Sequence, residues 1–91
     1  MILEFTETAW QDLCYWVESD PDKIKKIKEL IKSIKQSPYK GIGKPEPLRH
    51  EFKGCWSRRI SREHRLVYRM EGKRGRGQKC VILQCRYHYD K

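Results

Sequence analysis

The sequence predicts an α+β fold, in which two amphipathic N-terminal helices pack on one face of a small, mainly antiparallel sheet. Two stretches with apolar residues at helical spacing lie within residues 6–37. After residue 37 the pattern changes to short β-type runs separated by glycine-rich and proline-rich segments. Two amphipathic helices need an apolar surface to cover, and a sheet provides one. At 91 residues, the chain is expected to form a single domain, residues 1–91.

The N-terminal part begins with a predicted strand at residues 2–5. Thr6 is a suitable cap for a first helix, and an apolar stripe expected to face the core follows at i, i+3, i+4 and i+7: Trp10, Leu13, Cys14 and Val17. Asp20 and Pro21 are typical of an N-cap and a first helical position. Isoleucine and leucine at helical spacing then predict a second helix that ends before Pro38.

The C-terminal part is predicted to begin with a loop at residues 38–47, PYKGIGKPEP, because three prolines and two glycines cannot continue a helix. Strands are predicted at residues 51–53, 55–60, 64–70 and 79–89. Side chains alternate between the two faces of a strand. This alternation places Ile82, Gln84, Arg86 and His88 on one face, which the preceding strands extend with Arg59 and Arg65.

The charge is distributed unevenly along the chain. Residues 1–37 hold six lysines and seven acidic residues, a net charge of −1, whereas residues 38–91 hold fifteen basic and five acidic residues, a net charge of +10. All nine arginines lie in the second part. Arginine grips phosphate at two points, so this asymmetry favours a nucleic-acid partner over a merely solvated basic surface.

Composition excludes several other classes of protein. The longest strongly apolar run, residues 80–85, is far shorter than the roughly 20 residues of a membrane span. Acidic residues follow Met1 where a secretory signal would be apolar, so we expect a cytoplasmic protein without a membrane partner. The four cysteines show no CxxC spacing, so we expect reduced thiols, no metal and no cofactor.

A carboxylate and a histidine near a cationic sheet face would suit metal-free RNA cleavage. The 2′-hydroxyl must lose a proton, the phosphate gains charge, and the leaving 5′ oxygen must gain a proton. Glu46, held between Pro45 and Pro47, is the candidate base, and His88 is the candidate acid. Taken alone, Glu46 is also consistent with an ordinary exposed loop residue and His88 with a structural histidine.

Several motifs carry a resemblance to a known family. The segment GKPEPLRHEFKGCWSRRISREHRLVYRM and the later CRYHY resemble the YoeB toxins, a branch of the RelE/ParE superfamily of toxin–antitoxin systems. The early AWQDLCYW and KIKELIKSIKQSPYKGIGKPEPL extend the resemblance over nearly the entire chain. It implies a RelE-like microbial ribonuclease fold and a toxin that enters the ribosomal A site and cuts messenger RNA there.

The resemblance also implies roles for individual residues. Glu46 of KPEPL is the implied general base, Arg65 of EHRLVY stabilises the transition-state phosphate, and His88 of RYHY is the general acid. The implied RNA or phosphate contacts, including the final aromatic residue that shapes the site, are Lys44, Arg49, Arg59, Arg86 and Tyr89. Position 49 is arginine where the family often has lysine. The basic loop at residues 71–79 is longer than the family pattern, which fits either a contact to ribosomal RNA or a mobile insertion.

The family implies partners and leaves two alternatives. A Phd/YefM-type antitoxin with an acidic tail is the expected inhibitor, the ribosome and its messenger RNA are the expected targets, and a homodimer is suggested. A non-cleaving RNA or ribosome binder would use the same cationic face, and a ParE-like toxin would act on gyrase. Glu46 and His88 argue against both, because a binder needs no acid/base pair and the gyrase-directed branch lacks the KPEPL and RYHY motifs that carry these two residues.

Overall fold

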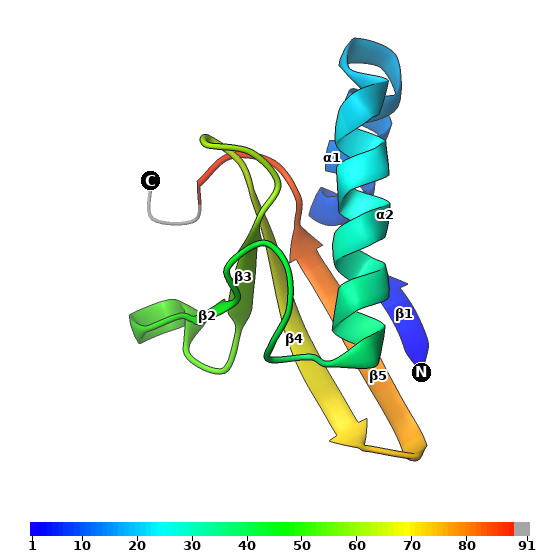
Figure 1. Ribbon diagram of the computed structural model, residues 1–91, viewed down its shortest axis with the longest axis vertical. Helices are drawn as coiled ribbons and strands as arrows, with labels where there is room; N and C mark the ends of the chain where they lie inside the picture. The colour runs from blue at the N-terminus through cyan, green and yellow to red at the C-terminus, as the bar shows by residue number, and fades with distance from the viewer. Residues whose placement is uncertain (89–91) are drawn as a thin grey trace.

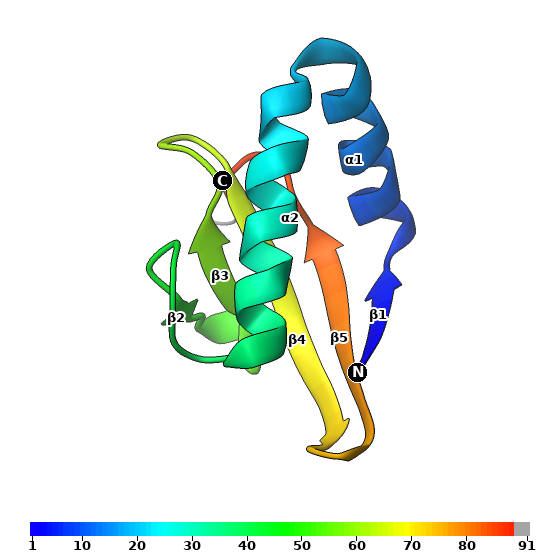
Figure 2. The ribbon, with the colours of Figure 1, turned by 45° about the vertical axis from the view of Figure 1, so that its right-hand side comes forward.

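The computed structural model describes residues 1–88. Its sheet has five strands in the order β1-β5-β4-β3-β2; β1 is parallel to β5 and the other neighbours are antiparallel. Both α-helices cover one face of this sheet (Figures 1 and 2). The other face, which we call the open face, carries no α-helix, although Leu48, Cys55 and Phe52 pack with Val67 there. The predicted α+β fold is confirmed.

The elements follow the predicted order with several shifted boundaries. They are β1 (Ile2–Phe5), α1 (Glu7–Ser19), α2 (Pro21–Gln36), β2 (Glu46–Pro47), a 3-10 helix (His50–Phe52), β3 (Trp56–Arg59), β4 (Arg65–Lys73) and β5 (Arg76–Gln84). The strand predicted at residues 51–53 is thus wrong, because a 3-10 turn occupies that stretch. Neither helix within residues 1–88 is long and apolar enough to cross a membrane.

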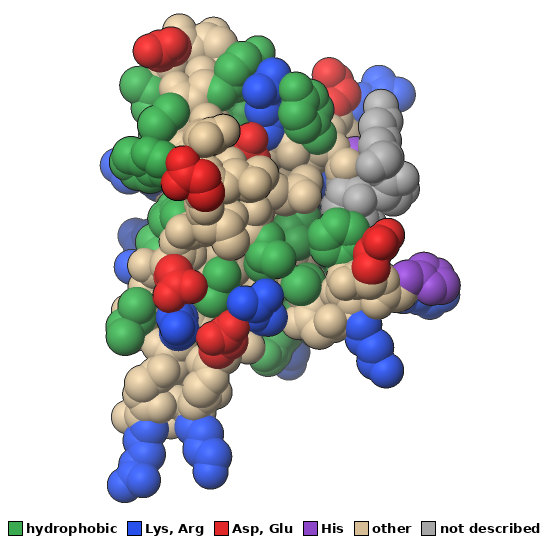
Figure 3. Space-filling model, turned by 180° about the vertical axis from the view of Figure 1, so that it is seen from behind, with side chains coloured by type: hydrophobic (Ala, Val, Ile, Leu, Met, Phe, Trp, Pro, Cys, Tyr) green, Lys and Arg blue, Asp and Glu red, His purple; other side chains and the backbone are tan. Residues whose placement is uncertain are grey.

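The core-facing side of α1 differs from the predicted stripe. Thr6 caps the helix as expected, its hydroxyl accepting from the Ala9 N–H at 3.1 Å. Ala9 and Trp16 are buried and Leu13 packs against the core, whereas Trp10 and Val17 are 53% and 58% exposed. The buried Trp16 indole satisfies its N–H by donating to the Cys85 carbonyl at 2.8 Å. Cys14 is also exposed, and hydrophobic side chains gather on the surface over α1 (Figure 3).

Helix α2 follows the sequence prediction closely. Pro21 takes the first helical position, and the buried residues of the helix are Ile27, Leu30 and Ile34. Asp20 does precede the helix, but its side chain does not cap the backbone. Instead its carboxylate accepts from the Lys23 ammonium at 3.0 Å. The apolar side of α2 packs with Leu66, Tyr68, Cys80 and Ile82 of the sheet in one core.

The last strand does not alternate as the sequence predicts. Tyr68 pairs with Ile82, but the preceding residue of β4, Val67, pairs with Gln84, so Leu83 is an extra residue in β5. Directly paired residues share a face, so Ile82 points to the helices with Tyr68 while Gln84 shares the face of Val67. The prediction that Ile82 and Gln84 lie on one face is therefore wrong.

Strand β5 also ends five residues before the predicted boundary at residue 89. The backbone of Cys85 is captured by α1, since its N–H donates to the Asp12 carboxylate at 3.0 Å and its carbonyl accepts from Trp16. The chain then crosses toward the side of the sheet opposite the helices (Figure 1). Arg86 and His88 are consequently not strand residues, and no alternation rule places them.

The basic stretch between β4 and β5 is not a long loop. The two strands continue through it until Lys73 pairs with Arg76, and only Arg74 and Gly75 remain as the turn. Gly75 has a φ of +78°, which glycine adopts without strain. The predicted loop at residues 71–79 is thus a β-hairpin, with a register shift between Glu71 and Lys73.

A fully buried arginine joins α2, β3 and the loop before β2. Arg58 has 0% exposure and its guanidinium donates to six oxygens. These are Tyr68 Oη (3.1 Å), Ser33 Oγ (2.8 Å) and the carbonyls of Ser37 (2.8 Å), Pro38 (3.4 Å), Lys40 (2.8 Å) and Ile42 (3.0 Å). The loop 37–42 is therefore wrapped around one cation.

We predict that Arg58→Met lowers the free energy of unfolding by about 3 to 5 kcal/mol, because it leaves several buried oxygens without a donor. Urea unfolding followed by circular dichroism measures the change. Arg62→Met, at an exposed arginine of the β3–β4 turn, is the matched control and should change stability by less than about 0.5 kcal/mol. Equal stability of the two variants would contradict the structural role of Arg58.

Candidate active site

Glu46 lies on the edge strand β2 rather than in a loop. It pairs with the buried Ser57 of β3, and the pairing continues where the Leu48 N–H donates to the Cys55 carbonyl at 2.9 Å. Proline is tolerated on an edge strand because no neighbour needs its N–H, so Pro45 and Pro47 restrict the backbone without breaking the sheet. Glu46 itself is exposed. A carboxylate is thus held on a short, stiff segment at the rim of the open face.

Two predicted cationic contacts flank this edge strand. Lys44 is exposed, with a φ of +51°, and Arg49 is exposed at the start of the 3-10 helix. The preceding Gly43 packs closely, because an added Cβ would lie 2.6 Å from Leu30 Cδ2. Its carbonyl accepts from the Arg59 N–H at 2.7 Å. The Lys44–Glu46 segment is therefore tied to both α2 and β3.

The structure brings Arg59 and Arg65 together. They are directly paired across β3 and β4, so both belong to the face away from the helices. Arg59 is exposed, whereas Arg65 is 9% exposed. Arg65 Nη1 donates to the carbonyls of Ser61, Arg62 and His64 at 2.9 to 3.1 Å. These bonds fix the plane of the Arg65 guanidinium at the end of the sheet.

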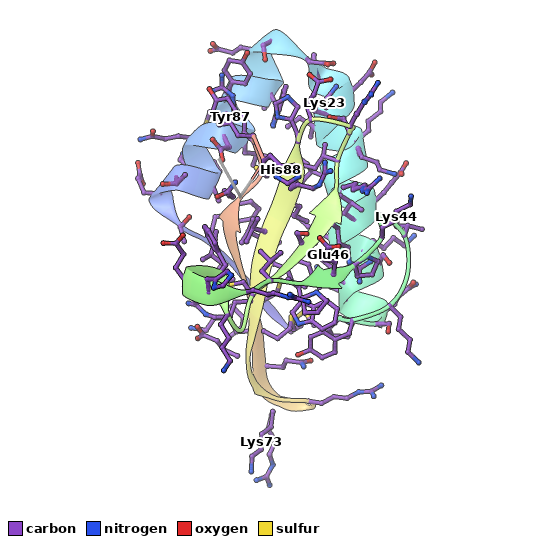
Figure 4. The ribbon with its side chains drawn as sticks, turned by 90° about the vertical axis from the view of Figure 1, so that its left-hand side faces the viewer. Lys23, Lys44, Glu46, Lys73, Tyr87 and His88 are labelled. Carbon is purple, nitrogen blue, oxygen red and sulfur yellow. The ribbon has the colours of Figure 1, made fainter. Side chains whose placement is uncertain are left out.

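His88 reaches the same face by a different route. Its segment is held by Asp12 and Trp16 at Cys85, and by two further bonds at Tyr87. The Tyr87 N–H donates to His64 Nδ1 at 2.8 Å, and the Tyr87 carbonyl accepts from the Arg65 N–H at 3.0 Å. Viewed from the open face, His88 and Glu46 both lie on this side of the sheet (Figure 4).

Arg86 does not join the other arginines. Its guanidinium stacks between two tyrosine rings, 3.4 Å from the centroid of Tyr15 and 4.4 Å from that of Tyr87. Tyr15 belongs to α1, so Arg86 points toward the helices instead of lying in the predicted row with Arg59 and Arg65. The stack helps to fix the segment that carries His88. Tyr89 lies outside the described residues.

Sequence reasoning missed the residues that support this site. Arg58 positions the loop before Glu46, and Asp12, Trp16 and His64 position the segment before His88. Arg58 carried a usable signal, because strand alternation puts it beside Trp56 and Ile60 on the apolar side of β3. A charge at such a position must find buried acceptors.

Two side chains that hold the segment before His88 have shifted pKa values, His64 at Tyr87 and Asp12 at Cys85. Burial lowers the pKa of His64, and the nearby cations Lys23, Arg86 and Arg65 act in the same direction, against Glu63. Burial raises the pKa of Asp12, although the Cys85 N–H and Arg86 oppose this. A neutral His64 is the form that accepts from Tyr87.

The thiols take no part in this arrangement. All four cysteines are free, and burial raises the pKa of Cys80 to about 11 and that of Cys85 to about 12. That the thiols are reduced stays a prediction. Within residues 1–88 no three His, Cys, Asp or Glu side chains group as metal ligands.

This fold, with two helices on one face of a five-stranded sheet, places the chain among the toxins of bacterial type II toxin–antitoxin systems. Within that class, residues 5–89 match the family described as the YoeB-like toxin of bacterial type II toxin-antitoxin systems. The chain belongs to this family, as the sequence motifs predict.

Similar proteins cover the chain almost completely. Toxin YoeB of Escherichia coli K12 is 48% identical over 98% of this chain and 100% of its own. The solved YoeB/ParE toxin of Agrobacterium tumefaciens has a TM-score of 0.92 at 45% identity, covering 98% of this chain and 100% of its own. YoeB of Staphylococcus aureus, solved as a dimer and as a heterotetrameric complex with YefM, has TM-scores of 0.86 and 0.85 at 40% identity, with 98% of each chain covered.

We predict that acidification destabilises the protein through His64. The pKa of His64 in the folded state lies below its unfolded value of 6.5, so the folded state favours the neutral imidazole. The stability that neutral His64 contributes is therefore complete above pH 6.5 and is lost as the pH falls through the folded-state pKa. Urea unfolding between pH 7.5 and 5 measures it, with His64→Asn as the comparison, because its side-chain oxygen can still accept from Tyr87. Parallel pH profiles for the two proteins would contradict the prediction.

Proposed function

We propose that this toxin is a ribosome-dependent endoribonuclease that cuts messenger RNA in the A site by general acid/base catalysis and thereby inhibits translation. The observation that carries the proposal is the shared open face, where Glu46, the pair Arg59 and Arg65, and His88 arrive from separate elements. Membership of the YoeB family supports the same conclusion.

The proposed chemistry needs only these side chains for its proton transfers. Glu46 takes the proton of the 2′-hydroxyl, and the 2′ oxygen forms a new bond to the adjacent phosphorus. The bond from phosphorus to the 5′ oxygen breaks, and protonated His88 gives its proton to that oxygen, leaving a 2′,3′-cyclic phosphate and a 5′-hydroxyl. Arg65, with its plane fixed by three carbonyls, stabilises the charge that develops on the phosphate.

The remaining predicted residues are proposed to bind RNA around the reacting phosphate. Arg59 lies beside Arg65, and Lys44 and Arg49 flank Glu46 on exposed backbone. Arg86 would contribute its charge from the tyrosine stack, and Tyr89 remains a proposed contact outside the described residues. A ribosomal target also implies that the toxin acts in the cytoplasm.

We predict that Glu46→Gln and His88→Gln each lower the rate of ribosome-dependent message cleavage by about 10² to 10⁴-fold, because each removes one proton transfer. Primer extension on messenger RNA in a reconstituted translation reaction, under single-turnover conditions, measures the rate. Exposed Glu51 of the 3-10 helix offers a matched control, Glu51→Gln, which should cleave at the parent rate.

Binding to ribosomes should survive both catalytic substitutions, since each side chain keeps its approximate shape. Parent-level cleavage by either variant would overturn the catalytic assignment. Translation inhibition without any cleavage by the parent protein would instead identify a non-cleaving ribosome binder.

A Phd/YefM-type antitoxin is the proposed inhibitor. The YoeB of Staphylococcus aureus forms a complex with YefM, and it is 40% identical to this chain. The charge of +10 on residues 38–91 would attract an acidic antitoxin segment. A segment drawn to the open face would cover the same cations that RNA needs.

A homodimer through α1 is the second proposed assembly. Trp10, Cys14 and Val17 form an exposed apolar stripe on this helix, and hydrophobic side chains gather over it (Figure 3). Exposed apolar patches of this kind mark interaction surfaces. The dimeric YoeB of Staphylococcus aureus makes a second copy the partner that we propose.

We predict that Trp10→Asp combined with Val17→Asp shifts a dimer to monomer, because two carboxylates would be buried at the contact. Sedimentation velocity measures the assembly. Lys25→Asp combined with Lys32→Asp, on the exposed side of α2, is the control and should leave a dimer intact. A parent protein that is monomeric, or a dimer that survives the α1 substitutions, would exclude this interface.

A further inference from the structure

The end of the β4–β5 hairpin carries a concentrated positive charge. We define the hairpin tip as residues 72–77, which contain Lys73, Arg74 and Arg76 within four positions. All three side chains are exposed. Basic side chains extend past the end of the molecule there (Figure 3), and Lys73 lies at the opposite end of the open face from His88 (Figure 4).

These three cations are not neutralised by neighbouring carboxylates. The nearest acidic residue along β4, Glu71, is already engaged by Arg69 at 2.7 Å and by Lys79 at 3.7 Å. Lys79 in turn pairs with Glu4 at 3.2 Å. Among residues 1–88, none of the ion pairs includes a residue of the hairpin tip, and Lys79 is the ion-paired residue of β5 that lies nearest to it.

The hairpin tip is a defined structure rather than a loose insertion. Lys73 and Arg76 pair directly, which keeps the turn to two residues. Gly72 has a φ of +79°, and a Cβ there would lie 2.6 Å from the Gly77 carbonyl oxygen. A side chain at position 72 would therefore force the two strands apart. The backbone presents the three cations on a narrow two-stranded ribbon.

The composition of the hairpin tip selects the class of partner. Its other residues are Gly72, Gly75 and Gly77, so it offers no apolar surface that an acidic protein segment could bury on folding against it. A nucleic-acid backbone needs no such surface, because binding is driven by release of counterions from its phosphates. Arginine and lysine are the side chains that supply these contacts.

We propose that the hairpin tip binds phosphates of structured RNA outside the cleavage site. The molecule measures 37 × 26 × 25 Å, and the tip projects at one end of its long axis, so the phosphates that it contacts are not those that meet Glu46 and His88. The inference rests on the proposed RNA target, and it makes the tip a second anchor that increases affinity without taking part in the chemistry.

The test is the salt dependence of binding to a short RNA duplex and, separately, to purified ribosomes. The variant Lys73→Gln, Arg74→Gln and Arg76→Gln is compared with Lys25→Gln, Lys28→Gln and Lys32→Gln, which removes the same charge from the exposed side of α2. Fluorescence anisotropy gives Kd at several salt concentrations. We expect the tip variant to flatten the plot of log affinity against log salt by about 2 to 3 units, and the α2 variant to leave it nearly unchanged.

A charge-preserving variant, Lys73→Arg with Arg74→Lys and Arg76→Lys, should keep the parent slope. Equal salt slopes for the tip and α2 variants, on the RNA duplex and on ribosomes alike, would overturn the proposal. An acidic peptide serves as a third binding target, and a tip variant that loses affinity only for this peptide would also overturn it. Cleavage at saturating toxin separates this proposal from the proposed function. A tip variant with the parent rate but weaker binding supports both, whereas a parent that binds RNA through the tip but does not cleave contradicts only the ribonuclease.

Discussion

The structure depends on one buried cation, the guanidinium of Arg58. A charge with no exposure is expensive unless every donor finds an acceptor, and here six oxygens surround it instead of a carboxylate. Four of these oxygens are backbone carbonyls of residues 37–42, the loop that follows the end of α2. The loop carbonyls thus provide the acceptors that the buried guanidinium needs, and the guanidinium fixes the conformation of the loop.

The same cation determines where Glu46 stands. Tyr68 Oη accepts from Arg58 and donates to the Pro38 carbonyl at 2.6 Å, so the start of the loop is fixed to the centre of the sheet. Burial raises the pKa of Tyr68, which keeps this hydroxyl protonated and able to donate. The end of the loop is fixed by Gly43 against β3. His88 is held independently, through the contacts of α1 and His64 with Cys85 and Tyr87. The two proposed catalytic groups therefore depend on two separate anchors.

Local patterns predicted the secondary structure better than the contacts between elements. Helix α2 and strand β1 follow from apolar spacing and the Asp20–Pro21 boundary, which are properties of neighbouring residues. The predicted core stripe of α1, which contains Trp10 and Val17, was wrong because a second apolar stripe, which contains Ala9 and Trp16, overlaps with it. The second stripe faces the core, where the Trp16 N–H finds a buried acceptor. The end of β5 could not be predicted, because the acceptor that captures Cys85 comes from Asp12, far away in the sequence. Arg59 and Arg65 were placed correctly since both lie within regular paired strands, whereas Arg86 lies beyond one.

The uneven charge of the sequence separates into different physical roles in the structure. Arg58 and Arg65 donate mainly to carbonyl oxygens, Arg69 pairs with Glu71, and Arg86 stacks on tyrosines. These contacts hold the scaffold, in addition to the roles in RNA binding and cleavage that we propose for Arg65 and Arg86. A lysine could not replace these arginines easily, because it lacks the planar guanidinium with several donors. The exposed cations Arg49, Arg59, Arg74 and Arg76 have no such internal partner among the described residues, so their charge is directed outward. Mutual repulsion among them opposes folding, and the binding of a polyanion would relieve it. A polyanionic ligand should therefore stabilise this fold as well as bind to it, and the site and the hairpin tip would both contribute to that coupling.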